Sequence, residues 1–220
     1  MSKHILMVTT NVDVMDGDIT TGLWLEEFAT PYRLFRATGY AVTVASPLGG
    51  ETPIDPKSMD GVDPNQFEGE LELLRHTKVL GDLDQAGFDA VFFPGGHGPI
   101  HDLPRNDHVK QLLKTYGAQG KVIGAVCHGV GALLEARLPN GRLLVEGRKL
   151  TAFTDSEEAA VALTDRVPYS VEQRLVAAGA RFSHGDDWAA YAVSDGNLVT
   201  GQNPQSSEAV ARQLIQAMGG

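Results

Sequence analysis

Residues 121–134, KVIGAVCHGVGALL, decide the fold, because within one residue they change from a buried strand pattern to a glycine-rich turn. The apolar run ends at Val126, Cys127 follows at once, and Gly129 and Gly131 open the next segment. A small residue, a nucleophile and a glycine at alternate positions are typical of a nucleophile elbow, a sharp strand-to-helix turn that presents the central side chain. We therefore expect Cys127 at the carboxyl end of a strand.

Three other apolar runs resemble the strand before Cys127. They are continuous rather than alternating, which suits strands that are buried on both faces of a parallel sheet. Stretches with helical periodicity lie between them, and this alternation predicts a doubly wound, flavodoxin-like α/β sandwich with a mostly parallel sheet. The predicted strands are residues 4–10, 41–47, 89–94 and 121–126, and the predicted helices are residues 24–38, 107–118, 129–136, 170–178 and 206–218.

Two segments depart from the alternation. Residues 48–69 are rich in Gly, Pro and Asp and are long for a loop, which is typical of a lid, a binding loop or a partner surface. Residues 192–201 contain Asp195-Gly196 between two strand patterns and predict a C-terminal β-hairpin. The length of 220 residues favours a single domain, 1–220, with 48–69 as a polar insertion.

The charge and cysteine content exclude several classes of protein. The 18 Lys and Arg face 28 Asp and Glu, and the net charge of −10 argues against nucleic acid and anionic membranes as partners. The one cysteine rules out an intramolecular disulfide and a four-thiolate zinc site. No signal peptide or membrane-spanning run is recognisable, so we expect a cytoplasmic protein.

The surroundings of Cys127 favour a reactive thiol. At the N-terminus of a helix, free N–H groups and the helix dipole lower the pKa of a thiol, whereas a lone Cys after an apolar strand is otherwise a small buried hydrophobe. A second strand ends in Gly95-Gly96, where backbone N–H groups can approach a bound oxygen. We expect the N–H groups of Gly96 and His128 to form an oxyanion hole.

A helix with adjacent glutamates supplies a candidate acid. Glu26 and Glu27 point about 100° apart on a helix, so at most one faces the sheet. Pro31 follows in the same helix and leaves the carbonyl of Glu27 without its usual partner. From these residues alone, an equally good interpretation is that both glutamates lie on a solvated face of the helix.

Taken together, six motifs resemble the ThiJ/PfpI superfamily, relatives of class I glutamine amidotransferases, and within it the branch of heat-shock chaperones and glutathione-independent glyoxalases III. The similarity covers nearly the whole chain. The motifs are TGLWLEE at residues 21–27, ASPLGG at 45–50 followed by PIDP at 53–56, FPGGHG at 93–98, AVCHG at 125–129, FTDSEE at 153–158 and VTGQNP at 199–204.

The resemblance assigns roles to residues at matching positions. It implies that Cys127 is the nucleophile and that Glu27, the second glutamate of the pair, is the acid beside it. His128 and a downstream acid complete a Cys-His-acid triad in this branch. That acid aligns with Glu158, while Glu157 and Asp155 remain alternatives.

The same resemblance implies a glyoxalase III activity, a hydro-lyase of the D-lactate dehydratase type. Cys127 would add to a small 2-oxoaldehyde such as methylglyoxal or glyoxal, and a 2-hydroxy acid would leave, with no cofactor or metal. The resemblance also implies a homodimer with a role in stress. The alternatives are a chaperone or redox-sensing module with a reactive Cys127, and a cysteine amidase or peptidase.

His97 and His101 raise the question of a metal site. They lie four residues apart on one loop, but that spacing normally needs a helix or further ligands nearby. We therefore predict no functional metal at this pair.

Overall fold

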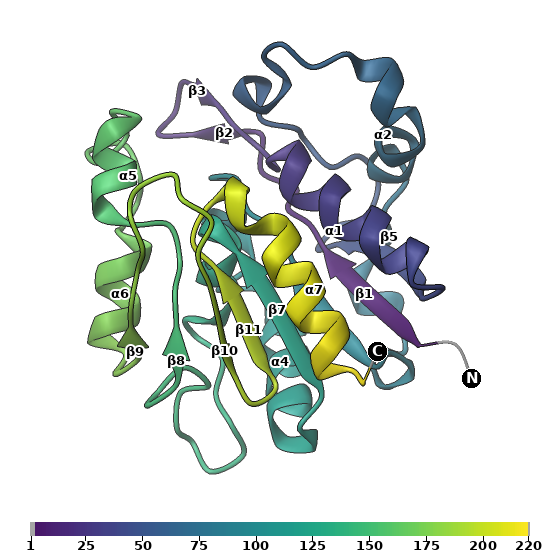
Figure 1. Ribbon diagram of the computed structural model, residues 1–220, viewed down its shortest axis with the longest axis vertical. Coiled ribbons are helices and arrows are strands. Elements are labelled where there is room, and N and C mark those ends of the chain that lie inside the picture. Colours follow the sequence, from purple (N-terminus) through teal and green to yellow (C-terminus); the bar gives the residue numbers. More distant parts are fainter. Residues whose placement is uncertain (1–2, 220) are drawn as a thin grey trace.

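A seven-stranded sheet forms the middle layer of the computed structural model, which describes residues 3–219 (Figure 1). The strand order is β10-β11-β7-β6-β1-β4-β5, and all neighbours are parallel except β10 and β11. The strands are β1 (His4–Val8), β4 (Ala41–Ser46), β5 (Lys78–Val79), β6 (Ala90–Phe93), β7 (Val122–Val126), β10 (Ala192–Asp195) and β11 (Leu198–Gly201). Two small pairs lie outside this sheet, β2 (Val14–Met15) with β3 (Ile19–Thr20) and β8 (Lys149–Leu150) with β9 (Arg181–Phe182).

Helices cover both faces of the sheet. In Figure 1, α1 and α7 lie side by side on one face, and α4 lies behind the sheet on the other. The α-helices are α1 (Leu25–Ala37), α2 (Glu68–Arg75), α3 (Pro99–Asp102), α4 (Asp107–Gln119), α5 (Asp155–Ala160), α6 (Val171–Ala177) and α7 (Ser207–Ala217). Short 3₁₀ helices are η1 (Pro56–Met59), η2 (Pro64–Phe67), η3 (Leu80–Asp82), η4 (Gln85–Gly87), η5 (Cys127–Leu133) and η6 (Pro204–Ser206).

The strands alternate between two apolar cores, one on each face of the sheet. On β6, Val91 packs in the core beside α4 and its neighbour Phe92 packs in the core beneath α1 and α7. Leu6 and Met7 of β1 divide in the same way. Because both faces of each strand are buried, the central strands read as continuous apolar runs, as the sequence predicted.

These features confirm the predicted α/β class with its mostly parallel sheet and C-terminal hairpin. One predicted helix is wrong in type, because residues 129–136 do not form an α-helix and the segment that begins at Cys127 is the 3₁₀ helix η5. Two glycines, Gly129 and Gly131, lie inside it, and glycine weakens the case for a regular α-helix. The polar segment 48–69 is also more ordered than a plain loop, since it contains η1, η2 and the start of α2.

The hairpin turn differs by one residue from the prediction. Asp195 pairs with Leu198, so the two turn residues are Gly196 and Asn197. The positive φ of 58° falls on Gly196 and not on Asn197, the pattern of a type II′ turn.

The carboxyl ends of the parallel strands gather at one edge of the sheet, the upper edge in Figure 1. The chain builds β4 and β5 on one side of β1 and then crosses to β6 and β7 on the other. Such a reversal of strand order leaves a crevice at the carboxyl ends, where ligands bind in open α/β sheets. Gly95 and Cys127 follow β6 and β7 at this edge.

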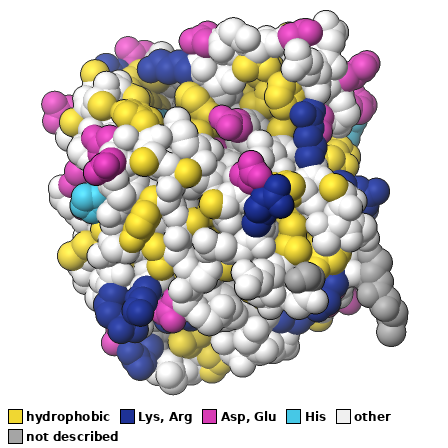
Figure 2. Space-filling view, in the orientation of Figure 1, with side chains coloured by type: hydrophobic (Ala, Val, Ile, Leu, Met, Phe, Trp, Pro, Cys, Tyr) yellow, Lys and Arg dark blue, Asp and Glu magenta, His cyan; other side chains and the backbone are white. Residues whose placement is uncertain are grey.

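Two further features of residues 3–219 concern the surface charge and the character of the helices. On the face drawn in Figure 2, basic side chains lie in separate groups with acidic side chains between them. None of the helices in this range combines the length and the apolar character that a bilayer span requires.

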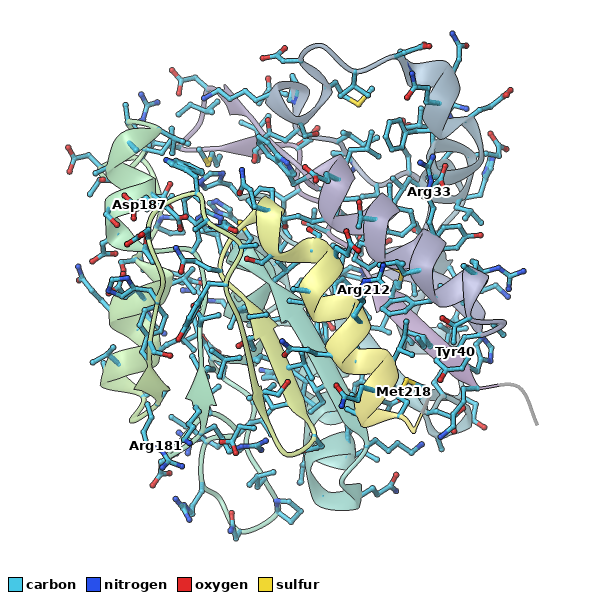
Figure 3. All side chains as sticks on the ribbon, viewed as in Figure 1. Arg33, Tyr40, Arg181, Asp187, Arg212 and Met218 are labelled. Carbon is cyan, nitrogen blue, oxygen red and sulfur yellow. The ribbon has the colours of Figure 1, made fainter. Side chains whose placement is uncertain are left out.

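Helix α7 is anchored by Leu214, which is fully buried and lies over Gly124 of β7. Its methyl group occupies the space above that glycine, because a Cβ built on Gly124 would lie 2.5 Å from Leu214 Cδ1. In Figure 3, Met218 at the end of this helix points toward the same core as Tyr40, beyond the end of α1.

We expect Leu214→Ala to lower the free energy of unfolding by about 2–5 kcal/mol, the usual range for a buried leucine that leaves a cavity. Urea denaturation measures the change. The exposed Gln216 on the same helix provides the control, and Gln216→Ala should stay within about 0.5 kcal/mol of the wild type. Equal losses in the two variants would contradict this packing of α7.

Candidate active site

Cys127 lies at the junction of β7 and η5 in a left-handed backbone conformation, with φ of 57°. A positive φ on a residue other than glycine is uncommon and is typical of a strained functional turn. Gly129 permits the turn, because a Cβ at this position would lie 2.4 Å from the Phe93 carbonyl oxygen. The nucleophile elbow predicted from the sequence is therefore present.

Backbone N–H groups surround the Cys127 sulfur. Those of His128 and Gly96 both interact with it and favour the thiolate. Gly96 has φ of 90°, and a Cβ there would lie 2.3 Å from the carbonyl oxygen of Gly22. The two donors expected from the sequence thus converge on one point, where they can also hold an oxygen that develops negative charge.

Glu27 reaches the same point from helix α1 and is fully buried. Its Oε2 accepts a hydrogen bond of 2.7 Å from the Gly95 N–H. Its Oε1 is buried without an oxygen or nitrogen partner among residues 3–219, and the side chain interacts with the Cys127 thiol. Of the two adjacent glutamates, Glu27 therefore faces the site, while Glu26 is exposed.

Burial raises the pKa of Glu27 to about 8, although the hydrogen-bonding contacts with Cys127 and with the Gly95 N–H act to lower it. A carboxyl group with that pKa is mostly protonated at neutral pH. The Oε1 atom then carries the proton and donates it toward sulfur, which accounts for its lack of another partner.

The thiol of Cys127 does not have the low pKa that its position before a helix suggested. Burial raises its pKa, and the neighbouring Glu27 raises it further, while the backbone N–H groups of His128 and Gly96 act in the opposite direction. The side chain is only 4% exposed, so desolvation outweighs a short 3₁₀ helix. The resting sulfur is therefore a thiol, and a reaction through its thiolate would need a base to take the proton.

His128 is positioned to be that base. Its Nδ1 lies 3.4 Å from the Cys127 sulfur, and its Nε2 lies 2.6 Å from Glu158 Oε2. Adjacent side chains on a helical turn normally diverge, but the left-handed residue before His128 turns its ring back toward the sulfur. With Nε2 donating to the carboxylate, Nδ1 keeps a lone pair for the thiol proton.

The electrostatics of this pair suit proton transfer. Burial lowers the pKa of His128 to about 4, with His97 acting in the same direction and Glu158 opposing it. Burial acts to raise the pKa of Glu158, but hydrogen bonds from His128 and His97 outweigh it and hold that pKa well below its ordinary range. An ionised carboxylate thus stands beside a neutral imidazole and would stabilise the imidazolium form.

The structure separates the three acidic candidates for the triad. Glu158 contacts His128, whereas Glu157 accepts hydrogen bonds from Asn203 Nδ2 at 2.8 Å and from the N–H of Trp188 at 2.9 Å. Asp155 accepts from Ser170 and from Gln173. Glu157 also forms a capping box with Thr154 at the start of α5. It therefore holds the helix that positions Glu158 and does not itself reach the imidazole.

His97 is the residue that sequence reasoning missed as part of this network. Its Nε2 lies 2.7 Å from Glu158 Oε1, so each carboxylate oxygen has one histidine partner. The signal for it was its place in the glycine loop after β6, directly after Gly96. His97, His128 and Glu158 offer ligand atoms within 4.8 Å of one another, a set that could hold a metal ion. His101, the partner considered from the sequence, is not in that set.

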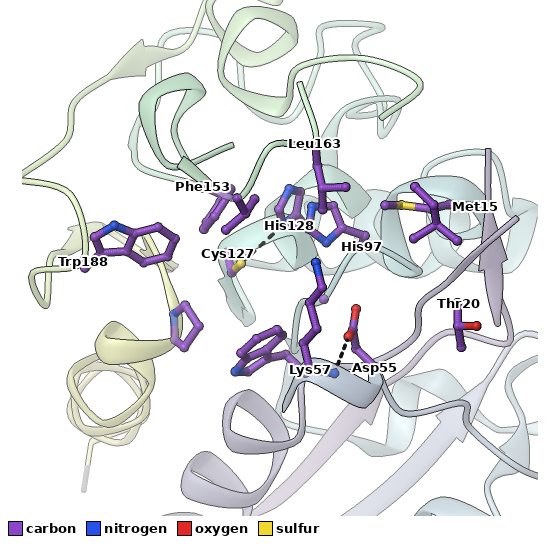
Figure 4. A pocket seen from close by; sticks show the side chains of 15 residues that line it. Met15, Thr20, Asp55, Lys57, His97, Cys127, His128, Phe153, Leu163 and Trp188 are labelled. Atoms are coloured by element: carbon purple, nitrogen blue, oxygen red, sulfur yellow. Dashed lines mark hydrogen bonds between the residues drawn. The ribbon is translucent and has the colours of Figure 1, made fainter. Parts of the chain in front are cut away.

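A cavity of about 90 Å³ opens in front of Cys127. Figure 4 shows the side chains of Cys127, His128 and His97 facing it, with Phe153 and Trp188 on one side and Asp55 and Lys57 on another. The remaining lining residues are Met15, Ile19, Thr20, Trp24, Gly96, Val161, Leu163 and Pro204.

The β2–β3 hairpin and the segment after α5 meet over this cavity. Both contribute apolar side chains to its wall, Met15 from the hairpin and Leu163 from the segment. Arg166 joins the two by ion pairs with Asp16 and Asp18. The cavity is thus covered by segments from distant parts of the chain.

Comparison with known proteins shows the family to which the chain belongs. The model of the DJ-1/PfpI family matches residues 19–217. The chain belongs to the DJ-1/PfpI family. Glyoxalase 3 of Candida albicans is 30% identical to it over 99% of this chain and 98% of the relative. The resemblance seen in the sequence motifs is therefore confirmed.

Two solved structures superpose closely on the chain. The crystal structure of glyoxalase III from Candida albicans has a TM-score of 0.86 and 28% identity, over 98% of this chain and 97% of that one. The Rapid Encystment Protein of Francisella tularensis has a TM-score of 0.94 and 38% identity, over 98% and 99%. The flavodoxin-like arrangement is thus shared with these two proteins.

Gly95 has no side chain, and this leaves the space in which Glu27 and Cys127 contact each other. A Cβ at Gly95 would lie 2.5 Å from Glu27 Oε2 and 2.8 Å from the Val126 carbonyl oxygen. We expect Gly95→Ala to lower the free energy of unfolding by about 1–3 kcal/mol, as overpacking does in well-packed sites. Gly69→Ala, where a Cβ meets nothing within 4 Å, should be neutral or stabilising. Urea denaturation compares them, and a neutral Gly95→Ala would refute this packing.

The raised pKa of Glu27 also makes stability depend on pH. Between its ordinary pKa and about 8, the folded state holds a proton that the unfolded state has released, so stability falls as pH rises through this window. The lowered pKa of His128 gives a slope of opposite sign, which fades as pH rises above its ordinary value of 6.5 and is shared by the wild type and a variant at Glu27.

We therefore expect the free energy of unfolding of the wild type to fall from pH 6.5 to 8.5 relative to that of Glu27→Gln, by about 1.4 kcal/mol per pH unit at most. Urea denaturation of both proteins at each pH measures the difference. Parallel curves for the two proteins would mean that Glu27 is ionised in the folded state.

Proposed function

We propose that this chain converts small 2-oxoaldehydes such as methylglyoxal and glyoxal to 2-hydroxy acids without glutathione or another cofactor. The observation that carries the proposal is a buried Cys127 thiol between a protonated Glu27 and a neutral His128, at the floor of a small cavity. Relatives named glyoxalase 3 support the same reaction.

The first step is addition of sulfur to the aldehyde. As Cys127 attacks C1 of the substrate, His128 Nδ1 takes the thiol proton across the present 3.4 Å contact. Glu158 stabilises the imidazolium through its 2.6 Å hydrogen bond. The N–H groups of Gly96 and His128 hold the oxygen that gains charge, and its protonation by the imidazolium gives a hemithioacetal.

The second step moves a proton from C1 to C2. Glu27 is the group suited to this transfer, because a pKa of about 8 lies close to neutral pH and lets one carboxyl both accept and return a proton. Glu27 gives its proton to the C2 oxygen as it takes the C1 proton, which forms an enediol. It then returns that proton to C2 and recovers a proton from the C1 hydroxyl group, which forms a thioester of the 2-hydroxy acid and restores the protonated carboxyl. This step is an isomerisation, so the substrate undergoes no net oxidation or reduction.

The third step releases the product. Water adds to the thioester carbonyl, with His128 as the base, and the C–S bond breaks so that Cys127 recovers its proton. The sum is one 2-oxoaldehyde and one water giving one 2-hydroxy acid, lactate from methylglyoxal. Every proton in this sequence moves through Glu27, His128 or water.

The geometry favours this enzyme over the alternative of a redox sensor. Oxidation to a sulfenic or sulfinic acid prefers an exposed thiol of low pKa. The Cys127 side chain is only 4% exposed, and burial raises its pKa. A hydrolase acting on acyl groups would use the same thiol and N–H donors, but the protonated Glu27 has a specific task only in the proton shift.

We expect purified wild-type protein to form lactate from methylglyoxal in the presence of a chelator and without added thiol, and Cys127→Ala to lose this turnover by a factor of about 10³ or more. An enzymatic lactate assay measures it, and suppression of a client's aggregation is measured in parallel. Substantial turnover by Cys127→Ala would overturn the role of Cys127 as nucleophile. An inactive wild type that still prevents aggregation would discard the catalytic proposal in favour of a chaperone.

The proposal also covers the domain organisation, the assembly and the location of the enzyme. We propose one catalytic domain spanning residues 1–220 with the insertion 48–69, a homodimer, and a cytoplasmic location. The sequence resemblance supports the assembly, and light scattering of the purified protein tests it.

A further inference from the structure

Lys57 brings a positive charge into the cavity wall from the insertion 48–69. It lies on η1, where its backbone N–H donates to Asp55 Oδ1 at 3.0 Å and fixes the start of that turn. In Figure 4 its side chain extends from η1 toward the space that Cys127 and His128 face. The side chain is exposed, so its ammonium group stands at the open side of the cavity.

The ammonium group of Lys57 has no hydrogen-bond or ion-pair partner among residues 3–219, and no other Lys or Arg of that range lines the cavity. The carboxylate of Asp55 also lines the cavity, where it accepts hydrogen bonds from Thr21 Oγ1 at 3.3 Å and from the backbone N–H of Lys57, and it forms no ion pair with the Lys57 ammonium group. The wall opposite is aromatic, formed by Phe153 and Trp188.

In this arrangement the polar groups of the site have separate roles. The reacting aldehyde has its own donors in the N–H groups of Gly96 and His128, and the carboxylate of Glu158 is fully occupied by two histidines. Lys57 takes part in none of these contacts. A lone cation at the mouth of a cavity with apolar walls attracts anions and holds them by charge-assisted hydrogen bonds.

We propose that Lys57 is a specificity-determining residue that makes this site prefer 2-oxoaldehydes carrying a carboxylate at the end remote from the aldehyde. The inference rests on the proposed function and names its substrate class. The substrate spans the cavity, with its aldehyde at Cys127 and its carboxylate on the Lys57 ammonium group. The chemistry is unchanged: one water is added, and 4,5-dioxopentanoate gives 2-hydroxypentanedioate.

The test compares two substrates of one shape. 4,5-Dioxopentanoate and 2-oxopentanal differ only in a carboxylate in place of a methyl group, and the ratio of their kcat/KM values measures recognition of the charge. We expect the ratio to favour the carboxylate in the wild type and to fall about five- to twenty-fold in Lys57→Met, the range for a partly exposed charge-assisted hydrogen bond.

Two further variants separate recognition from general charge. Lys57→Arg keeps a cation at the site and should retain the ratio within about threefold. Lys114→Met removes the same charge from an exposed position on α4, outside the cavity lining, and should leave the ratio unchanged. Added salt should reduce the ratio in the wild type and not in Lys57→Met.

A binding measurement keeps this inference separate from the proposed function. Levulinate and 2-pentanone lack the aldehyde, and the two tryptophans of the chain, Trp24 and Trp188, both line the cavity and report binding by fluorescence. In the Cys127→Ala background, levulinate should bind more tightly than 2-pentanone, and Lys57→Met should remove the difference.

The outcomes separate the two ideas. Levulinate binding that depends on Lys57, together with no turnover of either aldehyde, would remove the proposed function and keep the anion site. Turnover of both aldehydes with the same ratio in the wild type and Lys57→Met would overturn the role of Lys57 and keep the proposed function.

Discussion

The left-handed backbone of Cys127 is the constraint on which the site depends. Holding a residue other than glycine at positive φ costs about 1–3 kcal/mol, and the surrounding structure must supply it. Here Gly129 lets the turn pass close to the Phe93 carbonyl, and Gly95 leaves room beside the sulfur for Glu27. One conformation thereby directs the sulfur toward the acid and brings the ring of the following residue, His128, back to the sulfur. A relaxed helical residue at this position would separate all three groups.

Burial then determines which of these groups hold protons. The carboxyl of Glu27 and the thiol of Cys127 share a dry environment, and desolvation opposes charge on both, so the resting pair is neutral at physiological pH. The negative charge of the site is placed instead on Glu158, where two imidazole rings solvate it. His128 and Glu27, the proposed base and the proposed proton store, thus contact one sulfur but belong to separate hydrogen-bond networks.

The sequence was sufficient for features that depend on local pattern. The continuous apolar runs located the central strands, and AVCHG located the turn at Cys127 because small residues are needed there whatever lies around them. Glu27 could be distinguished from Glu26 only by resemblance, since the pattern allows either to face the sheet. Likewise, Glu157 and Glu158 are adjacent acids, and the capping box at Thr154 sets the helix so that only the second reaches His128.

Features that depend on distant packing could not be read from the sequence. His97 and Glu158 are 61 residues apart, and nothing local to either predicts their contact. The direction of the thiol pKa was wrong for the same reason. The expected lowering came from a local feature, the helix start, whereas the actual rise comes from burial by α1 and the loop after β6, which are remote in the chain. Local sequence therefore predicts which groups are present, and tertiary burial decides their charge.

The cavity is bounded partly by residues that follow strands of the central sheet and partly by segments outside that sheet. The sulfur and the oxyanion donors follow β7 and β6, strands that are buried on both faces and paired on both sides. The remaining walls include residues of the β2–β3 hairpin, η1 and the segment after α5, together with Trp24, Phe153, Trp188 and Pro204 from other connections, and none of these belongs to the central sheet. A substitution in these covering segments changes the shape or charge that a ligand meets without moving the elbow. Specificity can therefore vary within this fold while the reacting groups stay fixed, and a cation such as Lys57 on η1 lies where such variation is tolerated.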